Sequence, residues 1–266
     1  MAKILFFGDI MGKPGRKALA QVLPSLREEH QPDIVIANVE NLAHGKGVTA
    51  GTLQQLADLG VDVFSSGNHV FDKVPQAAEC FEKFPNLIRP ANYENSLPGP
   101  GYFRFSKGGQ NYLVINLGGR VFFEGQYHGE IANPFTVLDG LLSEQGQKGD
   151  IIIVDFHAEA TSEKSAMGWH ADGRIAAMLG THTHTPTADA RILPQGTAYI
   201  TDVGMTGPLN SVIGVKTENA LNMFLEKDKF RMEPEEEGPA VINAVLIETE
   251  GSRAKSITKI YLEIDG

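Results

Sequence analysis

The sequence predicts an α/β fold built from a mixed sheet, or from two packed sheets, with helices on the outside. Over the first 84 residues, short apolar runs alternate with segments of helical apolar spacing, which favours parallel strands joined by helices. The second half adds a hairpin pattern and further apolar strands. The 266 residues contain no repeats and no low-complexity linker, so we expect residues 1–266 to form a single domain.

The first third of the chain predicts a β-α-β-α-β unit followed by a helix. Pro14 stands near the start of the first helix, and Pro24 marks a kink or an early end of it. Thr49 is the expected N-cap of the second helix, which Gly60 closes. The predicted elements are, in order, a strand at Lys3–Phe7, a helix around Ala18–Leu26, a strand at Asp33–Ala37, a helix around Leu53–Ala57, a strand at Val61–Ser65 and a helix at Pro75–Phe84.

The rest of the chain predicts more strands than helices. Gly101–Ser106 and Asn111–Leu117 flank a glycine-rich turn, as the strands of a β-hairpin do. Ile151–Phe156 is almost continuously apolar, which is typical of a strand buried on both faces. The remaining expected elements are a helix around Phe135–Leu142 and strands at Arg174–Leu179, Ala188–Leu193, Ala198–Thr201, Ala240–Glu248 and Ser256–Glu263.

Composition excludes some classes of protein and favours a cytoplasmic one. The net charge is −10 and no dense basic run occurs, so charge gives no support to an association with RNA. No stretch approaches the ~18 apolar residues of a membrane span, and the N-terminal apolar run lacks the small-residue cleavage site of a signal peptide. The single cysteine, Cys80, excludes an intramolecular disulfide and fits a reducing compartment.

Polar side chains follow five of the predicted strands. Parallel strands present their carboxyl ends at one edge of a sheet, where ligands bind, so we expect these side chains to converge. His182 and His184 stand two residues apart between threonines, and in extended backbone both would point the same way. Each residue alone also fits a turn, a cap or a core hydrogen bond. The candidates are Asp9, Glu40, Asn41, Asn68, His69, His157, His182 and His184.

This set of side chains suits a pair of transition metals. A thiolate zinc site is excluded because the chain has one cysteine. Mixed imidazole and carboxylate donors suit Mn, Fe, Zn or Ni better than Ca or Mg alone. Without His69, seven candidate ligands remain, which is more than one four-coordinate ion needs. They fit two ions ~3.5–4 Å apart that share a carboxylate, as in many phosphatases and nucleases.

The ordered motifs resemble the calcineurin-like metallophosphoesterases, and within them the YmdB-type phosphodiesterases, over nearly the whole chain. Most members of the superfamily carry a histidine where Met11 stands and a bridging aspartate where Glu40 stands, and both departures are shared with the YmdB-type branch. The resemblance implies that Asn41 replaces the absent histidine. The strings that carry the resemblance are FGDIMG at 7–12, NVEN at 38–41, SGNH at 66–69, DFHAE at 155–159 and GTHTHT at 180–185.

The resemblance implies a fold, a reaction and a role for each motif residue. The fold is a sandwich of mixed sheets with flanking helices, and the ions are iron or manganese. The implied reaction is hydrolysis of phosphodiesters, chiefly 2′,3′-cyclic nucleotides, by a metal-activated hydroxide with His69 as the catalytic histidine. One ion would take Asp9, Glu40, Asn41 and His184, and the other would take Glu40, Asn68, His157 and His182.

Two other functions fit the same residues. A phosphomonoesterase, such as a nucleotidase or a protein phosphatase, would share the metal core. A non-catalytic regulatory protein could keep the metal site for binding alone, although an intact His69 argues against it. A homo-oligomer is compatible with the sequence. Further candidates are a substrate contact at His44, a pocket contact at His128 or His170, a phosphate-binding loop at Gly12–Arg16 and an orienting role for Asp155.

Overall fold

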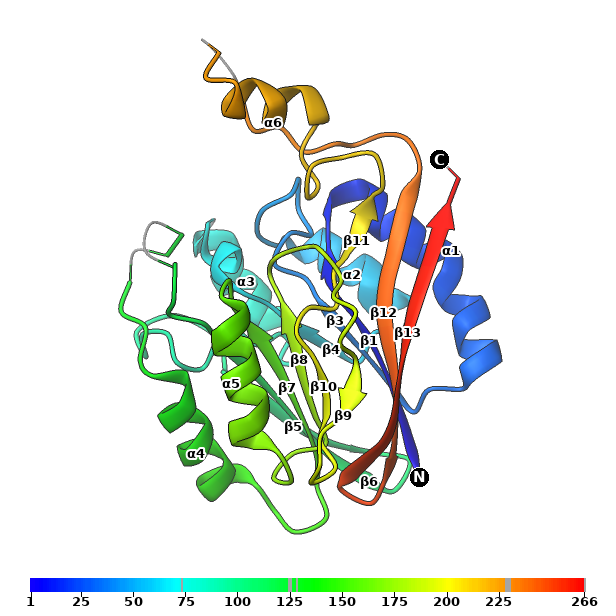
Figure 1. The fold of residues 1–266 in the computed structure, drawn as a ribbon, viewed down its shortest axis with the longest axis vertical. Coiled ribbons are helices and arrows are strands. Elements are labelled where there is room, and N and C mark those ends of the chain that lie inside the picture. Colours follow the sequence, from blue (N-terminus) through cyan, green and yellow to red (C-terminus); the bar gives the residue numbers. More distant parts are fainter. Residues whose placement is uncertain (73, 124–125, 128, 228–230, 266) are drawn as a thin grey trace.

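The computed structural model describes residues 1–72, 74–123, 126–127, 129–227 and 231–265, and it has two β-sheets packed face to face. Helices α1 (Gly12–His30), α2 (Ala50–Asp58) and α3 (Val74–Lys83) lie on the outer face of one sheet (Figure 1). Helices α4 (Pro134–Gln145) and α5 (Thr161–Ala171) lie on the outer face of the other. The predicted sandwich of two mixed sheets with helices outside is confirmed.

The first sheet contains seven strands among the described residues. Its order is β2-β11-β12-β1-β3-β4. Strands β11 and β1 pair with successive parts of β12, and β13 pairs along the whole length of β12. Strands β1, β3 and β4 are parallel, as the opening pattern predicted, whereas β12 joins β1 antiparallel. The bounds are β1 Ala2–Phe7, β2 Asp9–Ile10, β3 Ile34–Asn38, β4 Val63–Ser65, β11 Met205–Pro208, β12 Ala240–Glu250 and β13 Arg253–Ile264.

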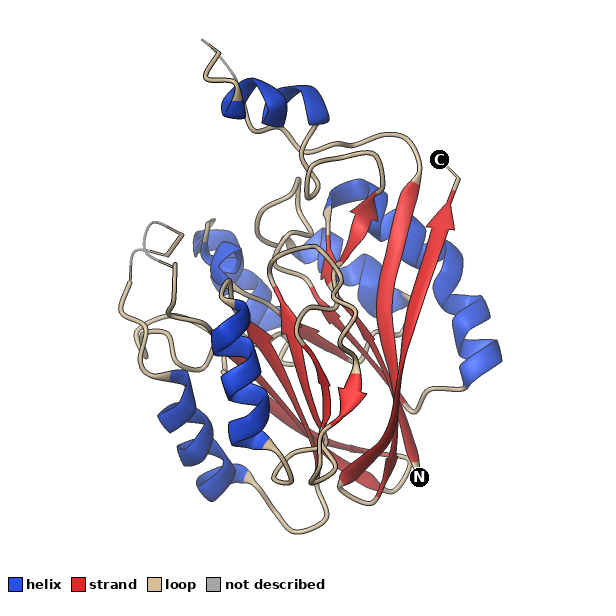
Figure 2. Cartoon of the chain, in the orientation of Figure 1, coloured by secondary structure: helices blue, strands red, loops and turns tan. Residues whose placement is uncertain are grey.

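The second sheet contains six strands in the described part of the chain, ordered β5-β6-β7-β8-β10-β9. The expected hairpin forms β5 (Tyr102–Lys107) and β6 (Gln110–Gly118). The four central strands, β6, β7 (Ile151–His157), β8 (Ala177–Thr181) and β10 (Ala198–Ile200), run parallel. The carboxyl ends of β7 and β8 therefore lie at the same edge of the second sheet. Strands β3 and β4 of the first sheet end at this same edge of the sandwich (Figure 2).

Three clusters of apolar side chains fill the layers. One lies between α1, α2, α3 and the first sheet, one between the two sheets, and one between the second sheet and α4 and α5. Successive residues of β1 alternate between layers, with Leu5 and Phe7 facing the helices and Ile4 and Phe6 facing the second sheet. Both faces of β1 are therefore covered, which is why this strand is apolar at successive positions.

Local sequence signals set several element boundaries. Thr49 caps α2 through a capping box with Thr52, as predicted. The prediction that the first helix ends early at Pro24 is wrong, because α1 continues to His30. Pro24 and Ala20 are both exposed, so the carbonyl that the proline cannot pair remains hydrated. The strand expected at Ala188–Leu193 shrinks to β9 (Arg191–Ile192), because the Asp189 carboxylate accepts hydrogen bonds from Thr187 and Thr201 and holds a loop there.

Three helical segments escaped prediction. They are α5, the 3-10 helix η1 (Asn68–Phe71) and α6 (Thr217–Phe224), which projects away from the sandwich (Figure 1). Helix α5 buries Glu163 and Lys164 on the face where apolar residues are expected, so its sequence lacks a clear apolar stripe. Within the described residues, no helix is both long and apolar enough to cross a bilayer.

Candidate metal centre

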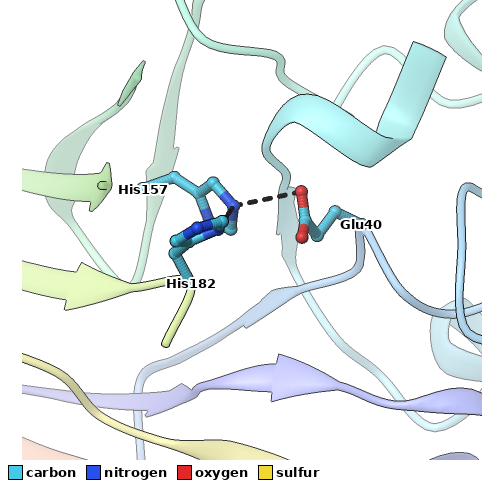
Figure 3. Close-up of side chains that lie close together, drawn as sticks. All are labelled: Glu40, His157 and His182. Atoms are coloured by element: carbon cyan, nitrogen blue, oxygen red, sulfur yellow. Dashed lines mark hydrogen bonds and ion pairs between the residues drawn. The ribbon is translucent and has the colours of Figure 1, made fainter. Parts of the chain in front are cut away.

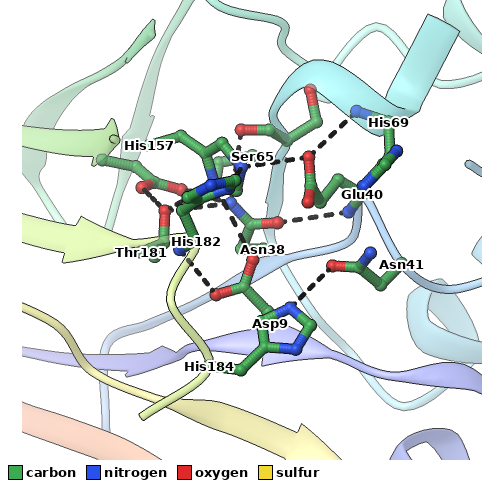
Figure 4. A network of polar contacts seen from close by, with 12 residues as sticks. Asp9, Asn38, Glu40, Asn41, Ser65, His69, His157, Thr181, His182 and His184 are labelled. Atoms are coloured by element: carbon green, nitrogen blue, oxygen red, sulfur yellow. Dashed lines mark hydrogen bonds and ion pairs between the residues drawn. The ribbon is translucent and has the colours of Figure 1, made fainter. Parts of the chain in front are cut away.

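The structure brings all seven predicted metal ligands together between the carboxyl ends of the two sheets. Figure 4 shows all of them except Asn68 by label, and Asn68 Oδ1 contacts the His157 ring. The first sheet contributes Asp9 from β2, Glu40 and Asn41 from the turn after β3, and Asn68 from η1 after β4. The second sheet contributes His157 as the last residue of β7, and His182 and His184 after β8. The convergence expected from strand ends is therefore present, but it spans two sheets.

Glu40, His157 and His182 form the first of two groups within the centre (Figure 3). The His157 Nε2 atom lies 3.1 Å from Glu40 Oε2, 3.0 Å from His182 Nδ1 and 3.2 Å from Asn68 Oδ1. One ring nitrogen carries at most one hydrogen, so it cannot donate to all three neighbours. Four donor atoms that converge in this way suit a cation among them.

Asp9, Glu40 and His184 form the second group. Asn41 joins it, with Oδ1 3.2 Å from His184 Nε2, while the Asn41 amide nitrogen donates to the Gly45 carbonyl at 2.9 Å. The other ring nitrogen of His184, Nδ1, donates to the Ile213 carbonyl at 2.8 Å. A neutral imidazole that donates through Nδ1 presents a lone pair at Nε2, which is the form that binds a metal.

Buried oxygen atoms show that the residues fit a pair of cations. Asp9 is fully buried, and its Oδ1 atom has no hydrogen-bond partner among the described residues, although Oδ2 accepts from the His182 backbone N–H at 3.1 Å. An unpaired buried carboxylate oxygen is costly, and a metal ion removes that cost. Glu40 belongs to both groups of potential ligands, so its carboxylate could contact a cation in either group.

In the protein without metal, the pKa values of the candidate ligands shift in opposite directions. Burial raises the pKa of Asp9. Burial would also raise the pKa of Glu40, but the ion pair with His157 outweighs it and lowers that pKa well below the usual range. Burial together with the charge of His157 lowers the pKa of His182 to about 2, which keeps this imidazole neutral and able to ligate. Opposed shifts of this size in one cluster are typical of functional sites.

A buried polar relay orients the His157 ring. Its Nδ1 lies 2.9 Å from Thr181 Oγ1, and that hydroxyl donates to Asp155 Oδ1 at 2.7 Å. The other oxygen of Asp155 accepts from Ser65 at 2.5 Å and from Asn38 at 2.9 Å. Burial raises the pKa of Asp155 to about 6. Asp155 thus reaches the histidine through Thr181, which sequence reasoning missed although it directly precedes His182.

The backbone around His182 and His184 differs from the expectation of an extended segment. Their φ angles are 102° and 63°, in the left-handed region. For residues other than glycine this conformation costs about 1–3 kcal/mol each and persists only where the surroundings enforce it. As a result the two imidazoles join different groups, His182 with His157 and His184 with Asn41. The structure brings both residues into the centre, but the expected geometric reason, an extended segment, was wrong.

His69 lies at the edge of the centre. Its backbone N–H donates to Glu40 Oε2 at 3.1 Å, and its ring Nδ1 lies 3.0 Å from Asp72 Oδ2. Burial lowers the pKa of His69, but the hydrogen bond with Asp72 and the charge of Glu40 outweigh that effect and raise it. The ring is partly exposed, so its Nε2 atom is available to a ligand.

The remaining candidates lie elsewhere. The ring of His44 is exposed and faces Glu236 at 3.3 Å, and His170 pairs with Asp139 at 2.9 Å. His128 lies outside the described residues. Gly12–Arg16 forms the first turn of α1. A residue that sequence reasoning missed is Phe123, a buried ring whose centroid lies 5.0 Å from that of His182.

Comparisons with known proteins agree with this architecture. A family model described as YmdB-like protein matches residues 5–260. A protein of Bacillus subtilis (strain 168) named 2′,3′-cyclic-nucleotide 2′-phosphodiesterase is 41% identical over 255 residues, which cover 96% of this chain and 94% of the relative.

Solved structures give the same result. A hypothetical protein from Thermus thermophilus has a TM-score of 0.90 at 40% identity, covering 98% of this chain and 99% of that one. A phosphatase from Mycoplasma pneumoniae has a TM-score of 0.92 at 35% identity, with coverage of 99% and 94%. The calcineurin-like phosphoesterase YfkN from Bacillus subtilis shares the fold, with a TM-score of 0.57 at 12% identity and coverage of 99% and 90%.

Proposed function

This chain belongs to the YmdB-like protein family, and we propose that it is a metal-dependent phosphodiesterase that hydrolyses 2′,3′-cyclic nucleotides. The observation that carries the proposal is the position of Glu40, whose carboxylate belongs to both groups of potential ligands. A shared carboxylate is the feature that separates a two-metal hydrolytic centre from a single structural site. The substrate class comes from the Bacillus subtilis relative and is proposed for this chain on its 41% identity.

Two ions, iron or manganese, fit the donor set. We assign one to Asp9, Glu40, Asn41 and His184, and the other to Glu40, Asn68, His157 and His182. When bound, such a pair would supply a nucleophile at neutral pH and neutralise charge on the phosphoryl oxygens. The protein residues keep the two positions close together and hold both in a largely buried environment, where electrostatic stabilisation is stronger than in water.

His69 is the proposed general acid. Its Nδ1 atom faces Asp72, so the proton for the leaving ribose oxygen would come from Nε2. The raised pKa of His69 supports this role, because a larger fraction of the imidazole is then protonated near neutral pH. The hydrogen bond from its backbone N–H to Glu40 ties the acid to the shared carboxylate.

The test is a side-by-side assay of the purified chain with added Mn²⁺ or Fe²⁺. Turnover of 2′,3′-cyclic AMP should exceed turnover of p-nitrophenyl phosphate. Replacing His69 with Ala should lower kcat by about 10²–10⁴-fold without removing the metal. His170→Ala is the matched control, since His170 also pairs with an aspartate but lies on α5 against Asp139 and Phe135. Preference for the monoester would instead indicate a phosphatase, and no turnover by the metal-loaded chain would indicate a binding protein.

A further inference from the structure

Beside the centre lies a buried ion pair for which the proposed reaction has no use. Lys164 Nζ on α5 lies 2.7 Å from Asp202 Oδ2, and the two side chains are 0% and 1% exposed. Burying both charges carries a large desolvation cost, and two well-packed apolar residues would often be as stable. A buried pair of this kind therefore calls for an explanation in terms of the groups it contacts.

The Asp202 carboxylate accepts two hydrogen bonds from one threonine. Its Oδ2 atom accepts from both the backbone N–H of Thr183, at 3.1 Å, and the Thr183 hydroxyl, at 2.8 Å. Its Oδ1 atom accepts from the Gly204 N–H at 2.8 Å, so the carboxylate is held from its own loop as well. Lys164 thus fixes Asp202, and Asp202 fixes both polar groups that Thr183 offers on this side.

Thr183 stands between the two histidines that enter different ligand groups. On one side, His182 Nδ1 lies 3.0 Å from His157 Nε2, and on the other, His184 Nε2 lies 3.2 Å from Asn41 Oδ1. Both histidines have left-handed φ angles, so the tripeptide cannot reach this shape without outside support. The hydrogen bonds of Thr183 to Asp202 supply that support at the central residue.

We propose that Lys164 and Asp202 are positioning residues that, by gripping Thr183, set the spacing of the two metal sites. The inference rests on the proposed dinuclear centre. It predicts that loss of the grip uncouples the two ions, because His182 and His184 can then relax independently. Outer partners that orient ligands commonly matter about 10–100-fold for metal affinity.

The chain offers a matched control at the opposite end of β7. Asp150, just before β7, is 1% exposed and pairs with Arg104 through two contacts of 2.7 and 2.8 Å. It also accepts from the Gln147 backbone N–H at 2.8 Å, as Asp202 does from Gly204. Asp150→Asn therefore removes a buried, paired carboxylate without touching any candidate ligand.

The experiment compares Asp202→Asn, Thr183→Val and Asp150→Asn with the wild type, all reconstituted with Mn²⁺. For each variant we measure the metal content, the Mn²⁺ affinity, the electron paramagnetic resonance spectrum and the melting temperature. We expect Asp202→Asn and Thr183→Val to bind the second ion at least about tenfold more weakly and to lose the spectrum of a coupled pair. Asp150→Asn should melt at a lower temperature yet keep two coupled ions.

Two results would overturn the inference. One is a folded Asp202→Asn variant with the wild-type affinity and coupled spectrum. The other is an equal loss of coupling in Asp150→Asn, which would make the effect one of general stability. If Asp202→Asn does not fold, Thr183→Val decides the question, because it removes only the hydroxyl donor. A wild type that binds no Mn²⁺ would instead defeat the proposed function itself, which is a separate outcome.

Discussion

The two halves of the metal centre are held in different ways. In the first half, His157 ends β7, and its ring contacts Thr181 of β8, whose hydroxyl donates to Asp155 of β7. In the second half, Asp9 lies on β2, but His184 and Asn41 lie on loops, where His184 donates to the Ile213 carbonyl and Asn41 donates to the Gly45 carbonyl. His157 is fully buried, whereas His184 is partly exposed.

This contrast teaches that one fold supplies a rigid site and an adaptable site side by side. Ligands on strands with buried hydrogen-bond partners are held more accurately than ligands on loops. We therefore expect the ion of the His157 half to bind more tightly and to exchange more slowly. Glu40, shared by both halves, is the residue through which they depend on each other.

The largest effect is expected from Glu40→Gln, which abolishes the contrast. The substitution keeps the shape of the side chain but removes the charge that serves both ions, so both should be lost together. We expect kcat for 2′,3′-cyclic AMP to fall by more than about 10³-fold. Metal analysis and steady-state kinetics measure the two effects. Retention of either ion at wild-type affinity would show that the halves are independent.

A smaller effect separates the halves from each other. His184→Ala should leave one tightly bound ion, because all four ligands of the His157 half remain. His157→Ala should leave only weak binding, because His184 and Asn41 of the remaining half lie on loops. Mn²⁺ titration of each variant, followed by calorimetry, measures the affinities. The reverse order, with tighter binding in His157→Ala, would contradict the assignment of rigidity to the strands.

A more modest effect is expected from the relay behind His157. Thr181→Val removes the hydroxyl between His157 and Asp155, so the ring loses its orientation while Asp155 keeps Ser65 and Asn38. We expect Mn²⁺ affinity of this half alone to fall by about tenfold. Thr181→Ser serves as the comparison, since it keeps the hydroxyl. An unchanged affinity in the valine variant would remove the relay from the account.

The smallest effect concerns Cys80, which lies in α3 away from both halves. Burial raises the pKa of its thiol from 9.0 to about 11. The folded state holds the thiol proton more tightly, so this contribution to stability is complete below pH ~9 and is lost as pH rises through ~11. At pH 8, iodoacetamide should label the native chain far more slowly than the unfolded chain. Equal labelling rates would contradict the burial.

Residue patterns alone predicted most of the strands and the convergence of the candidate residues, for physical reasons. Apolar runs such as Ile151–Phe156 must be strands buried on both faces, and the polar residue after each run must emerge at the edge of a sheet. The helix α5 could not be predicted this way, because its buried face carries Glu163 and Lys164 in place of apolar residues. That residues 1–266 form a single domain stays a prediction.

The details of the site depended on contacts distant in sequence. Thr183, between the left-handed residues His182 and His184, donates to Asp202, about 20 residues further on, and no local sequence pattern indicates this contact. The second partner of His184 is a backbone carbonyl, that of Ile213, which any residue type could supply. The candidate ligands follow from side-chain chemistry, whereas their division into two groups was implied by the family resemblance.

Anomalous X-ray diffraction from crystals of the Mn²⁺-loaded chain would show directly whether two ions share the Glu40 carboxylate. The account predicts two manganese peaks ~3.5–4 Å apart, with the Glu40 carboxylate between them. Asp9 and His184 should flank one peak, and His157 and His182 the other. A single peak, or two peaks that do not share Glu40, would contradict the dinuclear centre proposed for this chain.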